Sequence, residues 1–462
     1  MICIIGGGVA GLFTALELIN NNVPGEDIII LDKGKALDKR KCFANANTPC
    51  KKCKICSVTN GLGGSGSFSD SKLNFDPKGI VGGCLYELLS TDEISTLLNE
   101  VYNIYKQFNI EEFQSKVYGK NDSESALRLK QIIDNNQDIT LAECTTIHLG
   151  TDNSRIIYQR MIDYLISKGV QILSNTPLTE LSKKGDKWVV NSIEVDTVVL
   201  ALGRTGNRLI RGICEQHDIE LLNGRVDLGV RVETLNEYMK DLNDNFYEAK
   251  LYLKGSFNDS TRVFCTNPGG VVSIESYPQN DKSVFMANGH AYANNKTKNT
   301  NFALLVSRSF NSDCSNPQDD YLFPLAQAIN SLGKGQVIMQ SLKDIRLNRR
   351  STDDRIAELD IVPTVKAYAG DILSVMPYRH IVCILEALES LDKLAPGLNG
   401  DNTLLYAPEI KLHSNKVMIN KYGKAKDNLY IIGDCSGYTR GLTSAASMGI
   451  MCAKDIIGSG NK

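Results

Sequence analysis

The sequence predicts an α/β fold in which both ends of the chain contribute strands to one parallel sheet. Three observations predict it. Residues 2–31 read as a strand, a glycine-rich turn, a helix and a second strand. The segments 196–206 (DTVVLALGRTG) and 429–441 (LYIIGDCSGYTRG) each read as a buried strand that ends in small residues. Short apolar runs bounded by glycine favour buried parallel strands, and alternation with helices favours a doubly wound, Rossmann-like sheet.

The chain is long enough for more than one hydrophobic core. It has 462 residues, and roughly 150 residues per domain predicts two or three domains. We expect a nucleotide-binding domain made of residues 1–75, 145–210 and 425–462. A helical insertion is expected at 76–144, and an inserted mixed α/β or α+β substrate (cap) domain at 211–424. Because no low-complexity linker is visible, the domains should be interleaved.

Between the ends of the chain, several elements have their own local signal. Residues 91–137 are polar with few strand signals and should be helical, and residues 155–168 (RIIYQRMIDYLISK) have amphipathic helical spacing. Short strands follow at VQILSN, KWVVNS and DTVVLALG. A further helix is expected near 381–394.

Composition and charge limit the partners. Hydrophobic residues make up 42% of the chain, and Lys+Arg 51 against Asp+Glu 53 gives a net charge of -2. This balance fits a globular protein and does not imply nucleic acid as a partner. With no run of about 18 apolar residues, a membrane span is not expected. A first strand that starts at Met1 leaves no room for a signal peptide, so we expect a cytoplasmic protein.

A G-x-G-x-x-G motif follows the first strand and opens the helix; its glycines are Gly6, Gly8 and Gly11. The first allows the tight turn, the second lets a pyrophosphate approach the backbone, and the third lets the helix pack closely on the strand. The helix start, at Val9, offers free N–H groups and a positive dipole end. Asp32, with Lys33 beside it, stands near the usual distance for the acid that binds a ribose hydroxyl. Together these features predict dinucleotide binding.

The three segments together resemble the signature of glutathione-reductase-type FAD enzymes. In that family the last acid, here Asp434, binds the ribityl chain. The following helix, here starting near Gly441 and Leu442, points its N-terminus at the flavin and stabilises its reduced form. The resemblance implies that the nucleotide is FAD. Leu178 and Gly203 are further expected contacts of FAD.

A second glycine cluster lies at 61–66, and its predicted FAD contacts are Gly63, Gly64, Ser65 and Gly66. Backbone N–H groups and the hydroxyl of Ser65 or Ser67 could wrap the phosphates and the ribityl chain. The alternative is a flexible loop without a ligand. Lys72, which follows, is either a solvated lysine or a cation that stabilises reduced flavin.

Blocks along nearly the whole chain resemble more closely a bacterial family of uncharacterised FAD-dependent dehydrogenases (NAD(P)/FAD-dependent oxidoreductases). The blocks are GLGGSGSFSDSKLN (61–74), IHLGTD (147–152), VDLGVRVE (226–233), FCTNPGG (264–270), NGHAYANN (288–295) and the GDCSGYTRGLTSAASMGI ending. The chain departs from the family in two places. LLYAPEIKLHSN (404–415) replaces a GVETRTSSP-like segment, and Ser71 replaces a usual glycine. We therefore expect the substrate-facing chemistry to differ, and the resemblance supplies no substrate.

Four cysteines within 15 residues form a candidate metal site: Cys42, Cys50, Cys53 and Cys56. The C-x2-C-x2-C spacing resembles the first part of a ferredoxin cluster run, and four thiolates also fit one zinc ion. Neighbouring basic residues would lower the thiol pKa values; they are Lys39, Arg40, Lys41, Lys51, Lys52 and Lys54. An iron–sulfur cluster, a zinc ion, redox-active thiols and unreactive cysteines in a basic loop all stay open.

Three side chains are candidates for catalysis, although no acid or base is assigned. Lys72 could tune the flavin, and His290 could donate a proton to a reduced substrate or be an ordinary core or surface histidine. Tyr438, with Arg440, could bind an anionic substrate or merely pack near the flavin loop. The absence of a Ser-His-Asp order, a paired carboxylate motif and a P-loop leaves hydrolase and kinase functions without support.

The sequence thus predicts an FAD-dependent oxidoreductase that transfers hydride or electrons between flavin and an unidentified small organic substrate. The family name implies NAD(P)H as donor. Because no second G-x-G-x-x-G is visible, a nicotinamide would bind by other means, or electrons would enter through the cysteine cluster from a redox partner protein. Two alternatives stay open: an FAD-dependent tRNA-modifying enzyme, and a non-catalytic flavin and cysteine redox-sensing module.

Overall fold

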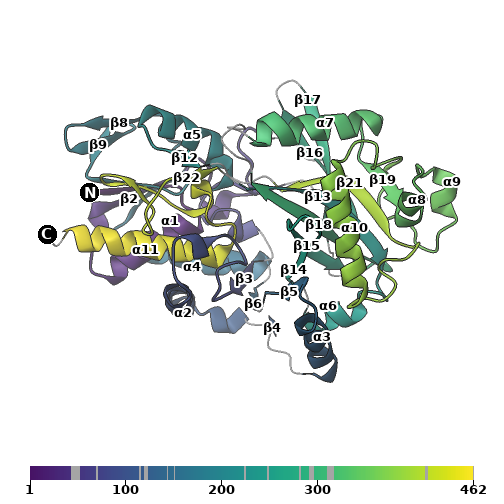
Figure 1. The fold of residues 1–462 in the computed structure, drawn as a ribbon. Helices are drawn as coiled ribbons and strands as arrows, with labels where there is room; N and C mark the ends of the chain where they lie inside the picture. Colours follow the sequence, from purple (N-terminus) through teal and green to yellow (C-terminus); the bar gives the residue numbers. More distant parts are fainter. Residues whose placement is uncertain are drawn as a thin grey trace. The chain divides into compact units, whose positions relative to one another are not determined.

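The structure, a computed structural model, divides the chain into two compact units (Figure 1). Unit 1 comprises Met1–Val117, Cys144–Leu222 and Ser414–Lys462, and unit 2 comprises Tyr118–Glu143 and Asn223–His413. The structure describes all residues except 43–52, 69–70, 114–115, 119–122, 143, 150, 223–224, 247–248, 280–281, 291–295, 310–316, 412–414 and 461–462.

Among the described residues, unit 1 is centred on a six-stranded sheet in the order β23-β24-β11-β1-β2-β7. The strands are β1 (Ile2–Ile5), β2 (Ile28–Leu31), β7 (Gln171–Leu173), β11 (Thr197–Leu200), β23 (Lys424–Lys426) and β24 (Leu429–Ile431). All neighbours are parallel except β23 and β24. Numbered along the chain, the parallel strands run 3-2-1-4-5, which is a doubly wound order. β1, β2 and β24 are buried throughout, as expected for the inner strands of a largely parallel sheet.

The helices of unit 1 come from distant parts of the sequence; they are α1 (Val9–Asn20), α2 (Thr91–Gln107), α4 (Thr151–Ser167), α5 (Asn207–Gln216) and α11 (Leu442–Gly460). Figure 1 shows α11 in yellow at the C-terminal end of the chain, and it packs along α1 and against α2. Gly449 permits the close approach, since a Cβ there would lie 2.4 Å from the Ala10 oxygen. The Thr14 hydroxyl donates to the Gly449 oxygen at 3.2 Å.

Smaller sheets complete unit 1. An antiparallel meander contains β8 (Leu181–Lys184), β9 (Lys187–Val190) and β10 (Ile193–Val195). β3 (Lys72–Phe75), β6 (Thr145–His148) and β4 (Lys116–Tyr118) form another sheet, and β12 (Leu221–Leu222) pairs with β22 (Lys416–Val417).

In the part of unit 2 that the structure describes, eight strands form a sheet in the order β20-β19-β21-β13-β18-β15-β14-β5. They are β5 (Ile139–Leu141), β13 (Arg225–Leu235), β14 (Leu251–Lys254), β15 (Ser260–Pro268), β18 (Asn299–Ser309), β19 (Ile338–Ser341), β20 (Tyr368–Ala369) and β21 (Leu404–Lys411). Among these described strands, only β19 and β20 form a parallel pair, and the other neighbouring strands are antiparallel. β16 (Val271–Gln279) and β17 (Lys282–His290) form a hairpin.

The helices of unit 2 are α3 (Glu124–Asp134), α6 (Lys240–Phe246), α7 (Phe323–Leu332), α8 (Leu342–Arg346), α9 (Asp353–Ala357) and α10 (Tyr378–Asp392). Alternate residues of β13, from Val226 to Val232, join the hydrophobic core that the sheet shares with α7 and α10. A largely antiparallel sheet with helices on its apolar face is an α+β arrangement.

The mixed α/β character predicted from the sequence is confirmed, as are most of the individual elements. The helices expected at 155–168 and 381–394 are α4 and α10, and the three short strands are β7, β9 and β11. The segment 76–144, expected as one insertion, is divided instead. α2 packs on α11 in unit 1, whereas α3 packs on α6 and β5 pairs with β14 in unit 2. Within the described residues, no helix is both long and apolar enough to span a bilayer.

Replacing Gly449 with Ala should destabilise unit 1. The added Cβ would lie 2.4 Å from the backbone oxygen of Ala10, so α11 must move away from α1, at a cost of about 1–3 kcal/mol. Gly458→Ala, in the same helix, is the matched control, because a Cβ at Gly458 meets nothing within 4 Å. Urea denaturation of both variants measures the effect. Equal stability of the two variants would contradict the close contact of α1 and α11.

Candidate functional site

The carboxyl ends of four neighbouring parallel strands meet at one edge of the unit 1 sheet. Ile5 of β1 is in register with Leu31 of β2 and Leu200 of β11, and Leu200 is in register with Ile431 of β24. Ligands of doubly wound sheets bind at this edge, where the strand order reverses, and here the reversal falls between β1 and β11. The residues that directly follow these four strands are Gly6, Asp32, Ala201 and Ile432. Gly6 and Asp32 are themselves predicted cofactor contacts. Ala201 and Ile432 each stand two residues before a predicted contact, Gly203 and Asp434.

The glycines of the first motif have different physical roles. Gly6 has φ +112°, and a Cβ on it would lie 2.2 Å from the Ala201 oxygen. A Cβ on Gly11 would lie 2.1 Å from the Gly6 oxygen. These two glycines are therefore required by the packing of the chain itself. A Cβ on Gly8 would make only an ordinary contact, 3.7 Å from Gly64 Cα, so the fold alone does not require glycine there.

The N-terminus of α1 is suited to an anion. Gly8 is the N-cap and has no side chain to accept a hydrogen bond, and the first turn, which starts at Val9, contains no acidic residue. The first N–H groups of a helix have no acceptor within the helix, and the helix dipole adds positive potential there. A phosphate group fits these requirements.

Asp32 is buried next to this helix start. Its Oδ2 accepts from the Gly7 N–H at 2.9 Å and its Oδ1 from the Gly34 N–H at 2.8 Å. Burial raises the pKa of the Asp32 carboxyl, although both hydrogen bonds and the charges of Arg40 and Lys33 oppose that rise. A carboxylate has about four acceptor positions, so Asp32 keeps capacity for ribose hydroxyls.

Arg40, which the sequence analysis counted only among the basic neighbours of the cysteines, organises the second glycine cluster. Its side chain is 0% exposed. The guanidinium donates to the Leu62 oxygen at 2.6 Å and the Gly64 oxygen at 2.8 Å, and further acceptors are Ser57 O, Val58 O, Gly61 O and Ser67 Oγ. Burial lowers the pKa of Arg40 to about 10, so the guanidinium stays charged at neutral pH. Arg40 therefore fixes the path of residues 57–67.

The second glycine cluster connects the starts of two helices. The Gly63 N–H donates to the Gly7 oxygen at 2.8 Å, before α1. A Cβ on Gly66 would lie 2.8 Å from Leu442 Cδ2, at the start of α11, and 3.3 Å from Val9 Cγ2. Ser67, expected as a ligand hydroxyl, is already used, since it accepts from Arg40 and donates to the Gly64 oxygen. Ser65 is exposed.

Asp434 lies beside the first turn of α1. A Cβ on the preceding Gly433 would come within 2.9 Å of Ala10 Cβ. Asp434 Oδ1 accepts from the Thr439 hydroxyl at 2.9 Å, and Oδ2 lies 3.4 Å from Arg204 Nε. Burial raises the pKa of the Asp434 carboxyl, and Arg204, Thr439 and Arg440 oppose it. With 19% of its side chain exposed, the carboxyl retains access from outside.

The hydroxyls of Thr443 and Ser444, in the first turn of α11, fix the start of this helix. A Cβ on Gly441 would lie 3.0 Å from Gly82 Cα. Thr443 Oγ1 donates to the Asn74 oxygen at 2.5 Å, and Ser444 Oγ donates to the Gly82 oxygen at 2.5 Å. No acidic residue occupies the first turn, so the positive end of this second helix dipole is not neutralised there.

Three further predicted contacts have clear positions. Lys33 donates to the Thr205 hydroxyl at 3.1 Å, and partial burial lowers its pKa. Gly203 follows β11 at the same sheet edge, and a Cβ on it would meet nothing within 4 Å. Leu178 is half-buried against the core of unit 1. That they contact FAD stays a prediction.

The three candidates for catalysis are not brought together within one unit. Lys72 starts β3 opposite His148 of β6, and Tyr438 is buried in unit 1 with Lys416 Nζ 5.4 Å from its ring centre. Burial raises the pKa of Tyr438 to about 12, so its phenol stays protonated. His290 is exposed at the end of β17 in unit 2. A catalytic role for each stays a prediction.

Ser71, the departure from the family pattern before Lys72, has φ +48°, a conformation that glycine adopts more easily. Its hydroxyl donates to the Gly66 oxygen at 2.7 Å and lies 2.7 Å from the Ser154 hydroxyl. These two hydrogen bonds stabilise the serine in a positive-φ backbone conformation that glycine adopts more easily.

The cysteine site is described only in part, because Cys50 lies outside the described residues. Cys42 and Cys53 are exposed and Cys56 is half-buried. Burial raises the pKa of Cys56, but hydrogen bonds from the Thr59 and Val58 N–H groups and the charge of Arg40 lower it overall. Among the described residues, no group of three or more His, Cys, Asp or Glu could hold a metal ion. The four-cysteine metal site thus stays an untested prediction.

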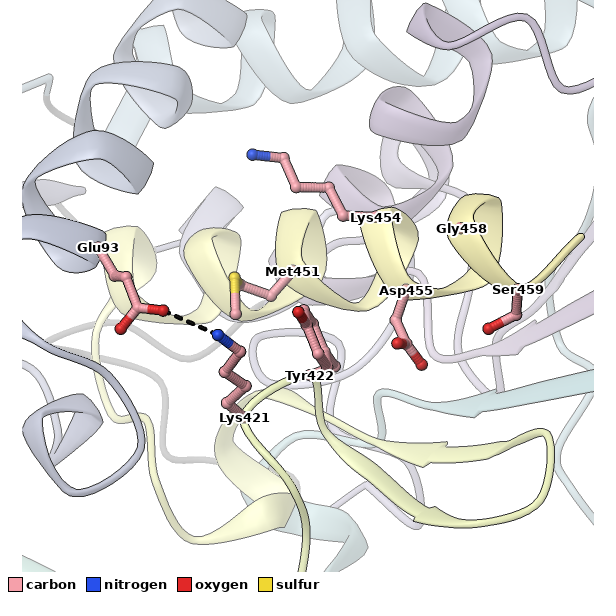
Figure 2. A pocket seen from close by; sticks show the side chains of 8 residues that line it. All are labelled: Glu93, Lys421, Tyr422, Met451, Lys454, Asp455, Gly458 and Ser459. Atoms are coloured by element: carbon pink, nitrogen blue, oxygen red, sulfur yellow. Dashed lines mark hydrogen bonds and ion pairs between the residues drawn. The ribbon is translucent and has the colours of Figure 1, made fainter. Parts of the chain in front are cut away.

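A groove of about 560 Å³ lies along the last turns of α11 (Figure 2); it is lined by Glu93, Lys421, Tyr422, Met451, Lys454, Asp455, Gly458 and Ser459. Its charges are paired. Lys421 contacts Glu93 at 2.9 Å, and Lys454 contacts Glu100 at 2.7 Å. Because the groove is far along α11 from the first turn and its cations have partners, it is not a candidate for the phosphates of a dinucleotide.

No protein-family model matches the sequence. An uncharacterized protein of Clostridium beijerinckii is 22% identical over 479 residues, covering 98% of this chain and 80% of that protein. Similar solved structures include CtdE in complex with FAD (11% identity, 98% of this chain and 83% of that chain, TM-score 0.31). NikD, an unusual amino acid oxidase, is also similar (11% identity, 98% and 92%, TM-score 0.38). Likenesses this weak establish neither family nor cofactor, and both stay predictions.

Replacing Arg40 with Lys should unfold the second glycine cluster. A lysine has three donors instead of five and cannot reach the same set of buried oxygens, so we expect a loss of about 2–4 kcal/mol of unfolding free energy. Lys39→Ala, at the adjacent exposed position, should change stability by less than about 0.5 kcal/mol. Thermal unfolding of both proteins measures the difference. A stable Arg40→Lys protein would show that the carbonyl contacts do not fix the loop.

Proposed function

We propose that this chain is an FAD-dependent oxidoreductase of the glutathione-reductase type, in which unit 1 holds FAD and unit 2 binds an organic substrate. The observation that carries the proposal is the common register of β2, β1, β11 and β24 at their carboxyl ends. It brings the three segments 2–31, 196–206 and 429–441, which contain these four strands, to one edge of the sheet, at the point where the strand order reverses.

The groups at this edge match the successive parts of FAD. The N-terminus of α1, with the bare backbone at Gly8, would bind the pyrophosphate, and Asp32 would accept from the adenosine ribose. Asp434, with 19% of its side chain exposed, would accept from ribityl hydroxyls. The start of α11 would face the flavin ring. Asp434 and the start of α11 lie outside the G-x-G-x-x-G unit. Because they would contact the ribityl chain and the flavin ring, they favour FAD over a nicotinamide dinucleotide.

When bound, FAD supplies two-electron hydride chemistry. The residues of the chain would position and tune it. The first turn of α11 has no acidic residue, so its dipole favours negative charge on a group bound there. Residues 57–67, fixed by Arg40, would cover the pyrophosphate side and exclude water. We propose NAD(P)H as the donor.

The visible spectrum of protein purified without oxygen tests this function. We expect flavin absorbance bands, and bleaching on addition of NADH or NADPH. Bands that persist with both nucleotides would overturn the proposed donor and leave the flavin assignment intact. A broad additional absorbance would identify an iron–sulfur cluster on the cysteines. If no flavin binds even after added FAD, the proposed function is wrong.

Gly8→Ala separates cofactor binding from folding. The added methyl group fits the protein, 3.7 Å from Gly64 Cα, but occupies the backbone surface that the pyrophosphate would approach. We expect the Kd for FAD to rise at least tenfold, or about 1.4 kcal/mol, with nearly unchanged stability of the apoprotein. Gly11→Ala is the contrasting variant, since its Cβ would lie 2.1 Å from the Gly6 oxygen and should destabilise the fold. Fluorescence titration with FAD measures Kd. Unchanged affinity in Gly8→Ala would argue against pyrophosphate at α1.

A further inference from the structure

The loop that follows β3 is folded around one buried carboxylate. Asp76 comes directly after β3, and it is only 3% exposed. Its Oδ1 accepts from the Lys78 N–H at 2.9 Å, and its Oδ2 accepts from the Ile80 and Val81 N–H groups, each at 2.7 Å. Hydrogen bonds to a charged acceptor are stronger than neutral ones, so this carboxylate fixes the backbone of residues 76–83. We call these residues the Asp76 loop.

The far end of the Asp76 loop is paired with the segment that precedes α11. Gly83 and Thr439 form an antiparallel bridge, with one backbone hydrogen bond on each side of it. A Cβ on Gly83 would lie 2.3 Å from the Tyr438 oxygen, so no side chain fits between the two segments. The Ser444 hydroxyl also donates to the Gly82 oxygen at 2.5 Å. The loop therefore contacts the chain both before α11 and in its first turn.

The bridge leads directly to the groups that would bind the flavin end of FAD. The Thr439 hydroxyl donates to Asp434 Oδ1 at 2.9 Å, and Asp434 is the acid proposed for the ribityl hydroxyls. Gly441, at the start of α11, packs so closely on Gly82 that a Cβ would lie 3.0 Å from the Gly82 Cα. A shift of the Asp76 loop would thus move the donor to Asp434 and the helix start together.

Different contacts fix the proposed adenosine end of the site. Asp32 accepts from the Gly7 and Gly34 N–H groups, and Gly8 is the N-cap of α1. None of these contacts involves the Asp76 loop. Loosening the loop should therefore weaken the binding of one end of FAD and leave the other end unchanged.

We infer that Asp76 is a positioning residue for the flavin end of the site. It acts through the Asp76 loop and the bridge between Gly83 and Thr439, which together hold Asp434 and the start of α11 in place. The inference rests on the proposed function, because only a bound FAD gives these two groups a common ligand. Asp76 itself is not a ligand of the cofactor in this proposal.

Asp76→Asn tests the inference. An asparagine keeps one acceptor oxygen, but its NH2 group would face a loop N–H to which the carboxylate offered an acceptor, so the loop should open. In titration calorimetry of flavin-free protein, we expect the Kd for FAD to rise at least tenfold. The Kd for ADP, which has only the adenosine and the pyrophosphate, should change less than twofold. Gly8→Ala should raise both values, as would a general loss of folded structure.

Hydrogen exchange tests the structural link without any cofactor. The Cys84 N–H donates to the Tyr438 oxygen at 2.8 Å, and the Arg440 N–H donates to the Gly82 oxygen at 2.7 Å. Asp76→Asn should accelerate the exchange of these two N–H groups at least tenfold, because the bridge would open more often. Mass spectrometry of the peptides that contain them measures the rate, and peptides of the second glycine cluster should keep theirs.

A milder variant and a matched control come from the first turns of α11. Ser444→Ala removes the bond to the Gly82 oxygen without changing any charge, and should raise the Kd for FAD at least threefold with an unchanged Kd for ADP. Ser447→Ala is the control. The Ser447 hydroxyl is buried and has no hydrogen-bond partner among the described residues, so both Kd values should stay the same. If Asp76→Asn does not fold, Ser444→Ala decides.

Three results would overturn the inference. In Asp76→Asn they are an unchanged Kd for FAD, equal increases in the Kd for FAD and ADP, and unchanged exchange at the bridge. With a wild-type protein that binds FAD, each of these results refutes only the role of Asp76 and leaves the proposed function intact. A wild-type protein that never binds FAD refutes the proposed function, and the role of Asp76 toward the flavin fails with it.

Discussion

At the carboxyl ends of β1 and β11 the two backbones are so close that no side chain fits between them. A Cβ on Gly6 would lie 2.2 Å from the Ala201 oxygen, and one on Gly11 would lie 2.1 Å from the Gly6 oxygen. This contact sets where α1 begins and how closely it packs on the sheet. The positions of Asp32, Asp434 and the second glycine cluster all follow from it, because each is held against the turn at Gly6–Gly8 or the first turn of α1.

The sheet of unit 1 could be predicted because its signals are local. Each buried strand is a short apolar run, and the glycines after β1 and β24 mark where the strands end and helices begin. The strand order itself was not predictable, since apolar runs do not encode which strands are neighbours. The structure supplies the 3-2-1-4-5 order, and only that order explains why motifs more than 400 residues apart, at Gly6 and Asp434, belong to one site.

The residues that the sequence analysis missed depend on tertiary context. Arg40 stands among lysines that are exposed, and nothing in its neighbours distinguishes a buried guanidinium that binds six oxygens. The dependence on tertiary context also explains why α2 was expected in a separate insertion. Its sequence does not indicate which of the two units its apolar face packs on. In contrast, β13 has core residues on one face and mainly polar residues on the other, and this arrangement had a visible signal. VDLGVRVE alternates apolar and polar residues with period two, which is typical of a strand with one face outside the core.

The two departures from the family pattern now have different physical explanations. At Ser71 the backbone has a positive φ, and the hydroxyl bonds to Gly66 and Ser154 hold the serine there. That substitution is explained by backbone conformation and needs no change of substrate. The segment 404–415 contains β21, in which Glu409 contacts Lys411 at 2.9 Å and the buried Arg231 of β13 at 2.8 Å. The two departures therefore act on different levels of the structure: Ser71 on the conformation of one backbone position, and β21 on the charges buried in the unit 2 sheet.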